Sequence, residues 1–174
     1  ISKIRTYLEG SMSEQYKFAA DTGKILDIVI DSLYSQKEIF LRELVSNASD
    51  AISKRQFDSL QGGAASSFDG LISIAVDKKA KRLTITDNGI GLNDEDLKNT
   101  LGSIASSGTK AFLEQMEQSD KKSKSQSYLI GQFGVGFYSA FMVAECVEVV
   151  SKKLDSDEAF CWASDGKSGF TISS

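Results

Sequence analysis

The longest helical pattern in the sequence carries a polar stripe beside its apolar face, and this stripe limits the possible folds most. The pattern covers residues 38–60. An α-helix advances about 100° per residue, so four polar residues fall within an arc of roughly 60°: Glu43, Asn47, Asp50 and Lys54. The apolar sector beside them holds Phe40, Leu44, Val45, Ala48, Ala51 and Ile52. The stripe therefore borders the core, where the wall of a pocket would stand; the alternative is a solvated face with an Asp50–Lys54 ion pair.

The remaining sequence mixes helical patterns with short strand patterns. Helical spacing is expected at 21–34, 94–102, 109–118 and from the glycines near 131 through 141. Strand patterns are expected at 71–77, 82–87, 143–151, 158–163 and 169–173, the first two forming an antiparallel hairpin. We therefore expect an α+β fold, a two-layer α/β sandwich with a mostly antiparallel sheet covered by helices.

Composition excludes several classes of function. The chain has 174 residues, enough for one domain, and its net charge of −4 gives no general basic surface for nucleic acid. It has no histidine, which excludes a Ser-His-Asp triad, an H-E-x-x-H zinc site and a histidine base within the chain. Cys146 and Cys161 are too few for a metal cage, so we expect two reduced thiols. No apolar run is long enough to span a bilayer.

A second segment, "LTITDNGIGL", places a carboxylate beside a glycine turn. By the two-residue period of a strand, Leu83, Ile85 and Asp87 share one face. If the two apolar residues face the core, Asp87 lies at its rim. The glycines of the turn at 88–91 then allow a flat ligand to approach the backbone. An Asp that merely caps a turn is the alternative.

A third segment, "IGQFGVGFYSAF" at 130–141, has the glycines of an anion site. Glycines at 131, 134 and 136 permit positive φ, so successive N–H groups can converge on a phosphate at the start of the following helix. The alternative is a structural loop packed on the core. Neither the P-loop nor the Rossmann spacing fits: "GKS" at 166–168 lacks the first glycine, and Gly134-x-Gly136 is followed by Ser139.

Together these segments resemble the Hsp90 chaperone family, over about residues 16–171. The resemblance rests on "IFLRELVSNASDA", "DNGIGL", "LGSIASSGTKAF" and "IGQFGVGFYSAFMVA". The first two motifs are shared with gyrase, MutL and sensor histidine kinases, whereas the last is far more specific to Hsp90. "LDIVIDSLYSQKEIF" is similar to the bacterial HtpG-like or mitochondrial TRAP-like branch.

The resemblance implies the Bergerat (GHKL) ATP-binding fold with a mobile lid at about 98–128. It implies slow ATP hydrolysis by the N-terminal domain of a longer protein. That protein would form a homodimer, remodel client proteins through lid closure and dimerisation, and bind neither nucleic acid nor membranes. In the family an arginine for catalysis comes from the following middle domain, so we expect hydrolysis by this chain alone to be very weak.

Site residues carry over position by position. Glu43 matches the general base that polarises the attacking water, and Asn47 matches the residue whose side-chain oxygen reaches Mg²⁺. Asp87 matches the acceptor for the adenine amine, and Thr171 matches a residue linked to adenine through water. The remaining matches for ATP or ADP are Asp50, Lys54, Gly91, Leu92, Leu101, Gly131, Gln132, Phe133, Gly134, Val135, Gly136 and Phe137.

Two positions depart from the family pattern, and the chain ends raise further expectations. Ser106 stands where many members have lysine, and Thr100 where others have Asn or His. We expect residues 1–11 to be cloning-derived or a flexible arm, because "GS" precedes Met12, and 12–174 to be the ATP-binding domain. A start at Met12 favours the cytoplasm, with the mitochondrial matrix as the alternative.

Two other functions stay open. One is the ATP domain of a gyrase, MutL or histidine-kinase relative, against which the Gln132–Phe133 context argues. The other is a nucleotide-sensing or interaction module without hydrolysis, which Glu43 in register with Asn47 disfavours.

Overall fold

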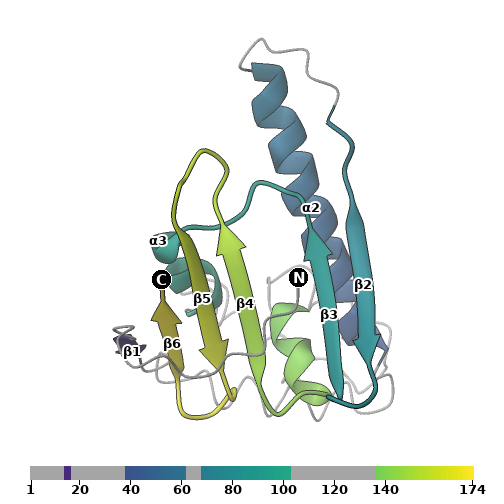
Figure 1. The fold of residues 1–174 in the computed structure, drawn as a ribbon, viewed down its shortest axis with the longest axis vertical. Helices are drawn as coiled ribbons and strands as arrows, with labels where there is room; N and C mark the ends of the chain where they lie inside the picture. Colours follow the sequence, from purple (N-terminus) through teal and green to yellow (C-terminus); the bar gives the residue numbers. More distant parts are fainter. Residues whose placement is uncertain (1–13, 17–37, 62–67, 103–135) are drawn as a thin grey trace, which may run out of the picture.

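The computed structural model describes residues 14–16, 38–61, 68–102 and 136–174, and these residues form two layers. Strands make up one layer, and the helices lie together on one side of them (Figure 1). In chain order the elements are β1 (Glu14–Tyr16), α2 (Ile39–Gln61), β2 (Ile72–Asp77), β3 (Arg82–Asp87), α3 (Asp94–Leu101), the 3₁₀ helix η1 (Gly136–Met142), β4 (Val147–Lys152), β5 (Ala159–Ser164) and β6 (Phe170–Ser173). The α+β class is therefore confirmed.

All strand pairs described are antiparallel. One sheet has the order β1-β6-β5-β4, and β2 and β3 form a separate hairpin. In the hairpin Ile74 pairs with Ile85 and Val76 with Leu83, as the alternating pattern predicts. Figure 1 shows β3 beside β4, with α2 behind the hairpin and α3 behind β5 and β6.

The main core lies between α3 and the four-stranded sheet. Its buried members are Leu97, Leu101, Trp162, Phe170 and Ile172. The rings of Trp162 and Phe170 stack with centroids 5.8 Å apart. Burying such side chains stabilises the fold by about 1.5–3 kcal/mol each, so α3 is held mainly by this face.

Local sequence sets both ends of α3. The side chain of Asn93 accepts a hydrogen bond from the Asp96 N–H, and the Asp96 side chain accepts one from the Asn93 N–H, which is a capping box. At the other end the Gly102 N–H donates to the Lys98 carbonyl. The pattern expected at 94–102 is thus confirmed, to within one residue.

Other expectations differ from the structure or lie outside it. The run expected to be helical near Phe141 is a 3₁₀ helix, and residues 143–146 precede β4 instead of belonging to it. Strand β1 was not predicted. The helices expected at 21–34 and 109–118 lie outside the described residues.

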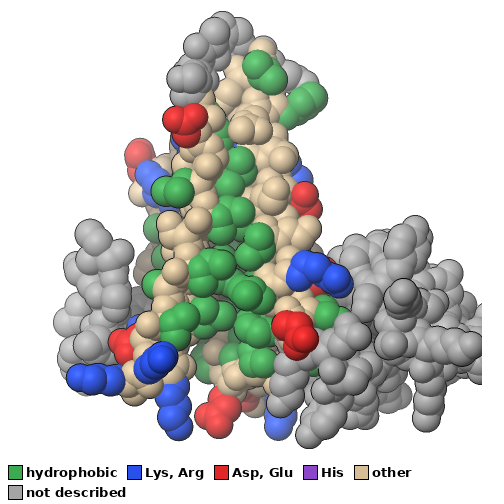
Figure 2. Space-filling model, turned by 90° about the vertical axis from the view of Figure 1, so that its right-hand side faces the viewer, with side chains coloured by type: hydrophobic (Ala, Val, Ile, Leu, Met, Phe, Trp, Pro, Cys, Tyr) green, Lys and Arg blue, Asp and Glu red, His purple; other side chains and the backbone are tan. Residues whose placement is uncertain are grey.

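The hairpin face expected to enter the core is largely open among the described elements. Leu83 is 40% exposed, Ile74 49% and Val76 66%. Figure 2, which views the molecule from the right-hand side of Figure 1, shows an apolar band along that side. None of the described helices is both long and apolar enough to cross a bilayer.

Candidate functional site

The polar stripe of α2 is exposed except at its first member. Asn47, Asp50 and Lys54 are exposed, whereas the Glu43 side chain is only 13% exposed and lies 3.5 Å from the Arg42 guanidinium. Ala48 and Ile52 are buried, as the helical spacing predicts. The stripe therefore does border the packed side of the helix.

The first residue of η1 lies directly against Glu43. A Cβ at Gly136 would come within 2.6 Å of Glu43 Oε2 and 3.2 Å of its Cβ, and Gly136 is buried. Only glycine leaves room there for the carboxylate. The structure thus brings the end of the glycine-rich segment to the acidic end of the stripe.

The turn after β3 reaches α2 about two helical turns further on. The Ile90 N–H donates to the Ala51 carbonyl at 3.1 Å, and a Cβ at Gly89 would lie 2.6 Å from the Ala51 backbone. Asp87 accepts a hydrogen bond from the Gly89 N–H through Oδ1 at 2.9 Å, and its side chain is exposed. The capping role and the site role for Asp87 are therefore compatible, since Oδ2 accepts no hydrogen bond from the described residues.

The glycines of this turn lie against other parts of the protein. Gly91 has φ +69°, and a Cβ there would lie 2.0 Å from the Lys152 carbonyl oxygen. Ala51 occupies the corresponding space at Gly89. Both glycines allow other parts of the protein to approach the backbone, and the approach of a ligand there stays a prediction. They fix the turn between α2 and β4.

Leu92 and its neighbours attach the same turn to the end of β4. The Leu92 N–H donates to Ser151 Oγ at 2.8 Å, and the Leu154 N–H donates to the Ile90 carbonyl at 2.7 Å. Lys153 Nζ lies 2.7 Å from Asp96 Oδ2, and this ammonium lowers the pKa of the Asp96 carboxyl. Leu92 packs against the core as a half-buried residue.

Two further predicted residues lie in or against the core, and five others are outside the described residues. Leu101 is buried in the core, and Phe137 packs against this core as a partly buried residue. Residues 131–135 lie outside the described residues, as does the expected lid after residue 102. The anion site of the glycine segment therefore stays a prediction.

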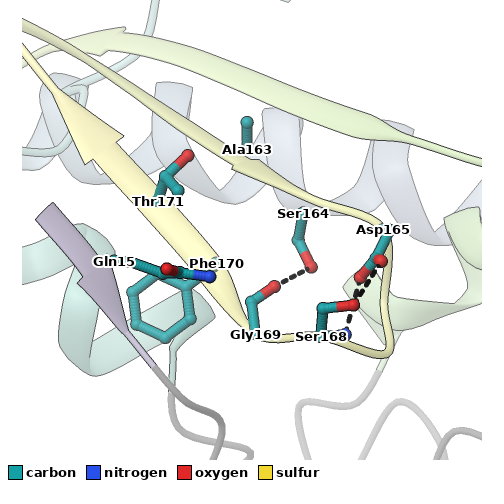
Figure 3. Close-up of a pocket in the computed structure, with 8 residues that line it drawn as sticks. All are labelled: Gln15, Ala163, Ser164, Asp165, Ser168, Gly169, Phe170 and Thr171. Carbon is teal, nitrogen blue, oxygen red and sulfur yellow. Dashed lines mark hydrogen bonds between the residues drawn. The ribbon is translucent and has the colours of Figure 1, made fainter. Parts of the chain in front are cut away.

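Thr171 is not brought to the other predicted residues. It lies in β6 opposite Ala163 and Gln15, and β5 and β4 stand between β6 and the hairpin (Figure 1). It lines a shallow hollow of about 170 Å³ at the β5–β6 turn (Figure 3).

The acidic residue at this hollow, Asp165, is hydrogen-bonded within the β5–β6 turn. Asp165 accepts hydrogen bonds from the Ser168 and Lys167 N–H groups and from the Ser168 hydroxyl. These donors lower the pKa of Asp165 to about 2, the Ser168 N–H contributing most. The hollow is therefore formed by the β5–β6 turn, and we do not include it in the candidate site.

A metal held entirely by protein does not fit the part of the chain that is described. No group of three or more acidic or cysteine side chains gathers among these residues. The Asn47 amide, within the stripe, can offer one hard oxygen, which suits Mg²⁺, because this ion keeps waters and takes nucleotide phosphates as ligands. The residues present thus fit a metal that arrives with a nucleotide.

One polar residue at the site was missed from the sequence. Arg55 Nη1 donates to the Asn88 carbonyl at 2.6 Å, so it joins α2 to the turn after Asp87. Arg55 follows Lys54 in an ordinary helical pattern, and no local signal distinguishes it from a solvated arginine.

Comparisons with known proteins show the family to which the chain belongs. The family model described as histidine kinase-, DNA gyrase B- and HSP90-like ATPase matches residues 34–166. The chaperone protein HtpG of Roseobacter denitrificans is 53% identical over 166 residues, which are 94% of this chain and 26% of that protein. HtpG of Treponema denticola is 52% identical over 160 residues, 91% of this chain and 24% of that protein. HtpG of Gluconobacter oxydans is 50% identical over 161 residues, 92% of this chain and 26% of that protein.

The chain thus spans about a quarter of the length of these curated relatives. The matched region contains all of α2, the turn after β3 and η1, which are the described segments that meet at the stripe. This chain therefore belongs to the family of histidine kinase-, DNA gyrase B- and HSP90-like ATPases, and within that family it is similar to the bacterial chaperone HtpG.

Proposed function

We propose that this chain is the N-terminal, ATP-binding and weakly hydrolysing domain of a longer HtpG-type chaperone. One observation carries the proposal: two segments far apart in sequence, the turn after Asp87 and the start of η1 at Gly136, both pack on the polar-striped helix α2. The family match to ATPases covers the same segments.

The two contacts divide α2 into two ends with different chemistry. Near Ala51, the Asp87 carboxylate is exposed and can accept a hydrogen bond from the amine of adenine. Near Gly136, Glu43 can hold and polarise a water for attack on the terminal phosphate. Asn47 lies between them along the helix and supplies its amide oxygen toward the metal that accompanies the phosphates. Base recognition and hydrolysis are thus set about two helical turns apart.

Mg²⁺ bound with the nucleotide supplies charge neutralisation at the phosphate oxygens. This chain's own residues bind and orient the base and hold the attacking water. No arginine reaches Glu43 from outside α2 among the described residues, so we propose that a residue of the rest of the protein completes the catalytic site. Turnover by this chain alone is then very slow.

We also propose an activity for the longer protein to which this chain would belong. Because the chain covers about a quarter of its relatives, client remodelling and homodimer formation belong to the parent protein. Bacterial relatives favour a cytoplasmic location.

Calorimetric titration with ADP and Mg²⁺ tests the proposal. The unchanged chain is expected to bind ADP, and Asp87→Asn is expected to weaken binding by at least about ten-fold, because an amide presents an NH₂ donor where the adenine amine requires an acceptor. Asp77→Asn is the matched control. Asp77 ends β2 and caps the following turn through its Oδ1, a role that an amide oxygen retains.

Two results would count against the function. If the unchanged chain does not bind ADP, the nucleotide site is absent. If Asp87→Asn binds as well as Asp77→Asn, the base is held elsewhere.

A further inference from the structure

We propose that Arg55 is a positioning residue of the nucleotide site: it holds the turn that carries Asp87 against α2 and so sets where the base is bound. The inference rests on the proposed function. It assigns Arg55 to the site although the residue is outside the polar stripe.

Asn88, which follows Asp87 directly, is tied down through all of its polar groups. Its side chain accepts from the Leu71 N–H at 2.8 Å and donates to the Asp69 carbonyl at 2.9 Å. Its N–H donates to the Leu71 carbonyl at 3.3 Å, and its own carbonyl accepts from Arg55 at 2.6 Å. The first three bonds join the turn to residues 69–71, which precede β2, and among the described residues only the bond from Arg55 joins Asn88 to α2.

The guanidinium of Arg55 is itself held in place. Its central carbon lies 4.2 Å from the centroid of the Phe68 ring, and the residue is half-buried. A planar guanidinium over an aromatic face is favoured and loses little freedom when it donates. The short bond to Asn88 is therefore made by an arginine that is already oriented.

Arg55 and Ala51, one helical turn apart on α2, both hydrogen-bond to the segment that follows β3. Ala51 accepts from Ile90, and Arg55, four residues later, donates to Asn88. These two bonds flank Gly89, whose N–H donates to Asp87 Oδ1. The orientation of the Asp87 carboxylate relative to Asn47 and Asp50 thus depends on both attachments.

Loss of the Arg55 bond affects the Asp87 side of the turn. The Ile90–Ala51 bond and the contacts of Gly91 with β4 remain, so the fold keeps its main attachments. The peptide next to Asp87 loses its charged donor, and a small displacement of a binding group has a large effect on a fixed ligand. The consequence is weaker base binding with little change in folding.

The test is a double-mutant cycle on ADP–Mg²⁺ affinity, measured by calorimetry on the 174-residue chain. The variants are Arg55→Gln, Asp87→Asn and the two combined, with Arg55→Lys as the conservative change. Arg82→Gln is the matched control, since Arg82 is an exposed arginine at the opposite end of β3 from Asp87. Thermal unfolding is recorded for each.

We expect Arg55→Gln to weaken ADP binding roughly ten-fold in the unchanged background, from loss of a hydrogen bond to a charged donor. In the Asp87→Asn background it should change affinity less than about two-fold, since the two residues act through one contact. Arg55→Lys should lie between, because it keeps a charged donor but not the planar group over Phe68. Arg82→Gln should bind normally.

Equal losses in both backgrounds would overturn the proposal, because Arg55 would then act independently of Asp87. Normal binding by Arg55→Gln would overturn it as well. If Asp87→Asn removes measurable binding, amide hydrogen exchange at Gly89 decides: Arg55→Gln must exchange faster there than Arg82→Gln, and equal rates reject the role. If the unchanged chain does not bind ADP, the proposed function fails; if it binds and only the Arg55 effect is missing, this inference alone fails.

Discussion

The carboxylate of Glu43 occupies the space that a side chain at residue 136 would need. Glycine at this position is therefore a condition for the position of the proposed base, quite apart from any backbone freedom it confers. The remaining glycines of the segment, at 131 and 134, are outside the described residues, so the reason for them stays a prediction.

At this scale we predict the effect of Gly136→Ala. The added methyl must displace the Glu43 carboxylate, so single-turnover phosphate release should fall by roughly a hundred-fold, the lower end of the range for general base catalysis. ADP affinity should stay within about two-fold, because the base-side turn at Ala51 is untouched, and overpacking should cost about 1–3 kcal/mol of stability.

Glu43→Gln provides the comparison for this variant. If the carboxylate is what the methyl disturbs, adding Gly136→Ala to Glu43→Gln should reduce phosphate release no further. A separate loss in the double variant would mean that Gly136 matters for another reason.

Among the elements, α3 and η1 are joined by one buried hydrogen bond. The Tyr138 hydroxyl donates to the Leu101 carbonyl at 2.6 Å, and Tyr138 is 1% exposed. Burial raises the pKa of this phenol well above its ordinary value of 10.0. The bond thus closes the C-terminal end of α3 with a neutral donor.

We predict that Tyr138→Phe destabilises the chain at neutral pH by about 1–3 kcal/mol, because the buried Leu101 carbonyl loses this donor. A raised folded pKa stabilises the fold below the unfolded pKa and loses that contribution as pH rises above it. The unchanged chain should therefore lose stability above about pH 10, and Tyr138→Phe should lose less.

Urea unfolding between neutral pH and pH 10.5 measures both effects. Tyr16→Phe is the control, since the Tyr16 hydroxyl bonds to Glu14 at an exposed site. Equal alkaline losses in the unchanged chain and in Tyr138→Phe would show that another group titrates.

Elements with a strong local signal were predictable from sequence. Helix α2, the hairpin strands and α3 lie within one or two residues of their predicted bounds, because the periodicity of apolar residues that predicted them is a local property of the sequence. Strand β1 was not predictable: Glu14, Gln15 and Tyr16 show no clear alternation of apolar and polar residues, and their partner strand is at the other end of the chain.

The sequence predicted candidate residues for the site, but it did not predict which residues contact one another there. The stripe on α2 follows from helical geometry, and the family resemblance supplied the roles. The packing of Gly89 on Ala51, of Gly91 on Lys152 and of Arg55 on Asn88 depends on tertiary approach of distant segments, which no local pattern encodes.

For the whole molecule, the turn at 88–92 connects the hairpin and α2 with the four-stranded sheet. Gly91 lies against the Lys152 carbonyl, and the Leu154 N–H donates to Ile90. We predict that Gly91→Ala destabilises the chain by about 2–4 kcal/mol, since its φ of +69° disfavours a side chain and the methyl overlaps the backbone of β4.

Thermal unfolding followed by calorimetry tests this prediction. Ser151→Ala, which removes only the hydroxyl that accepts from the Leu92 N–H, should cost about 1 kcal/mol and serves as the milder comparison. A melting temperature for Gly91→Ala equal to that of Ser151→Ala would show that the close packing of Gly91 on Lys152 is not needed to join the hairpin and α2 to the four-stranded sheet.

The pairing of Glu14 with Ile172 has a consequence for how the domain is made in a cell. The ribosome synthesises the chain from its N-terminus, so β1 has no strand partner until the chain has been made as far as β6. Closing so long a loop is entropically costly and slow, and the exposed edge of β6 stays open until it happens. The four-stranded sheet is therefore complete only when β1, its first strand in the sequence, pairs with β6, its last.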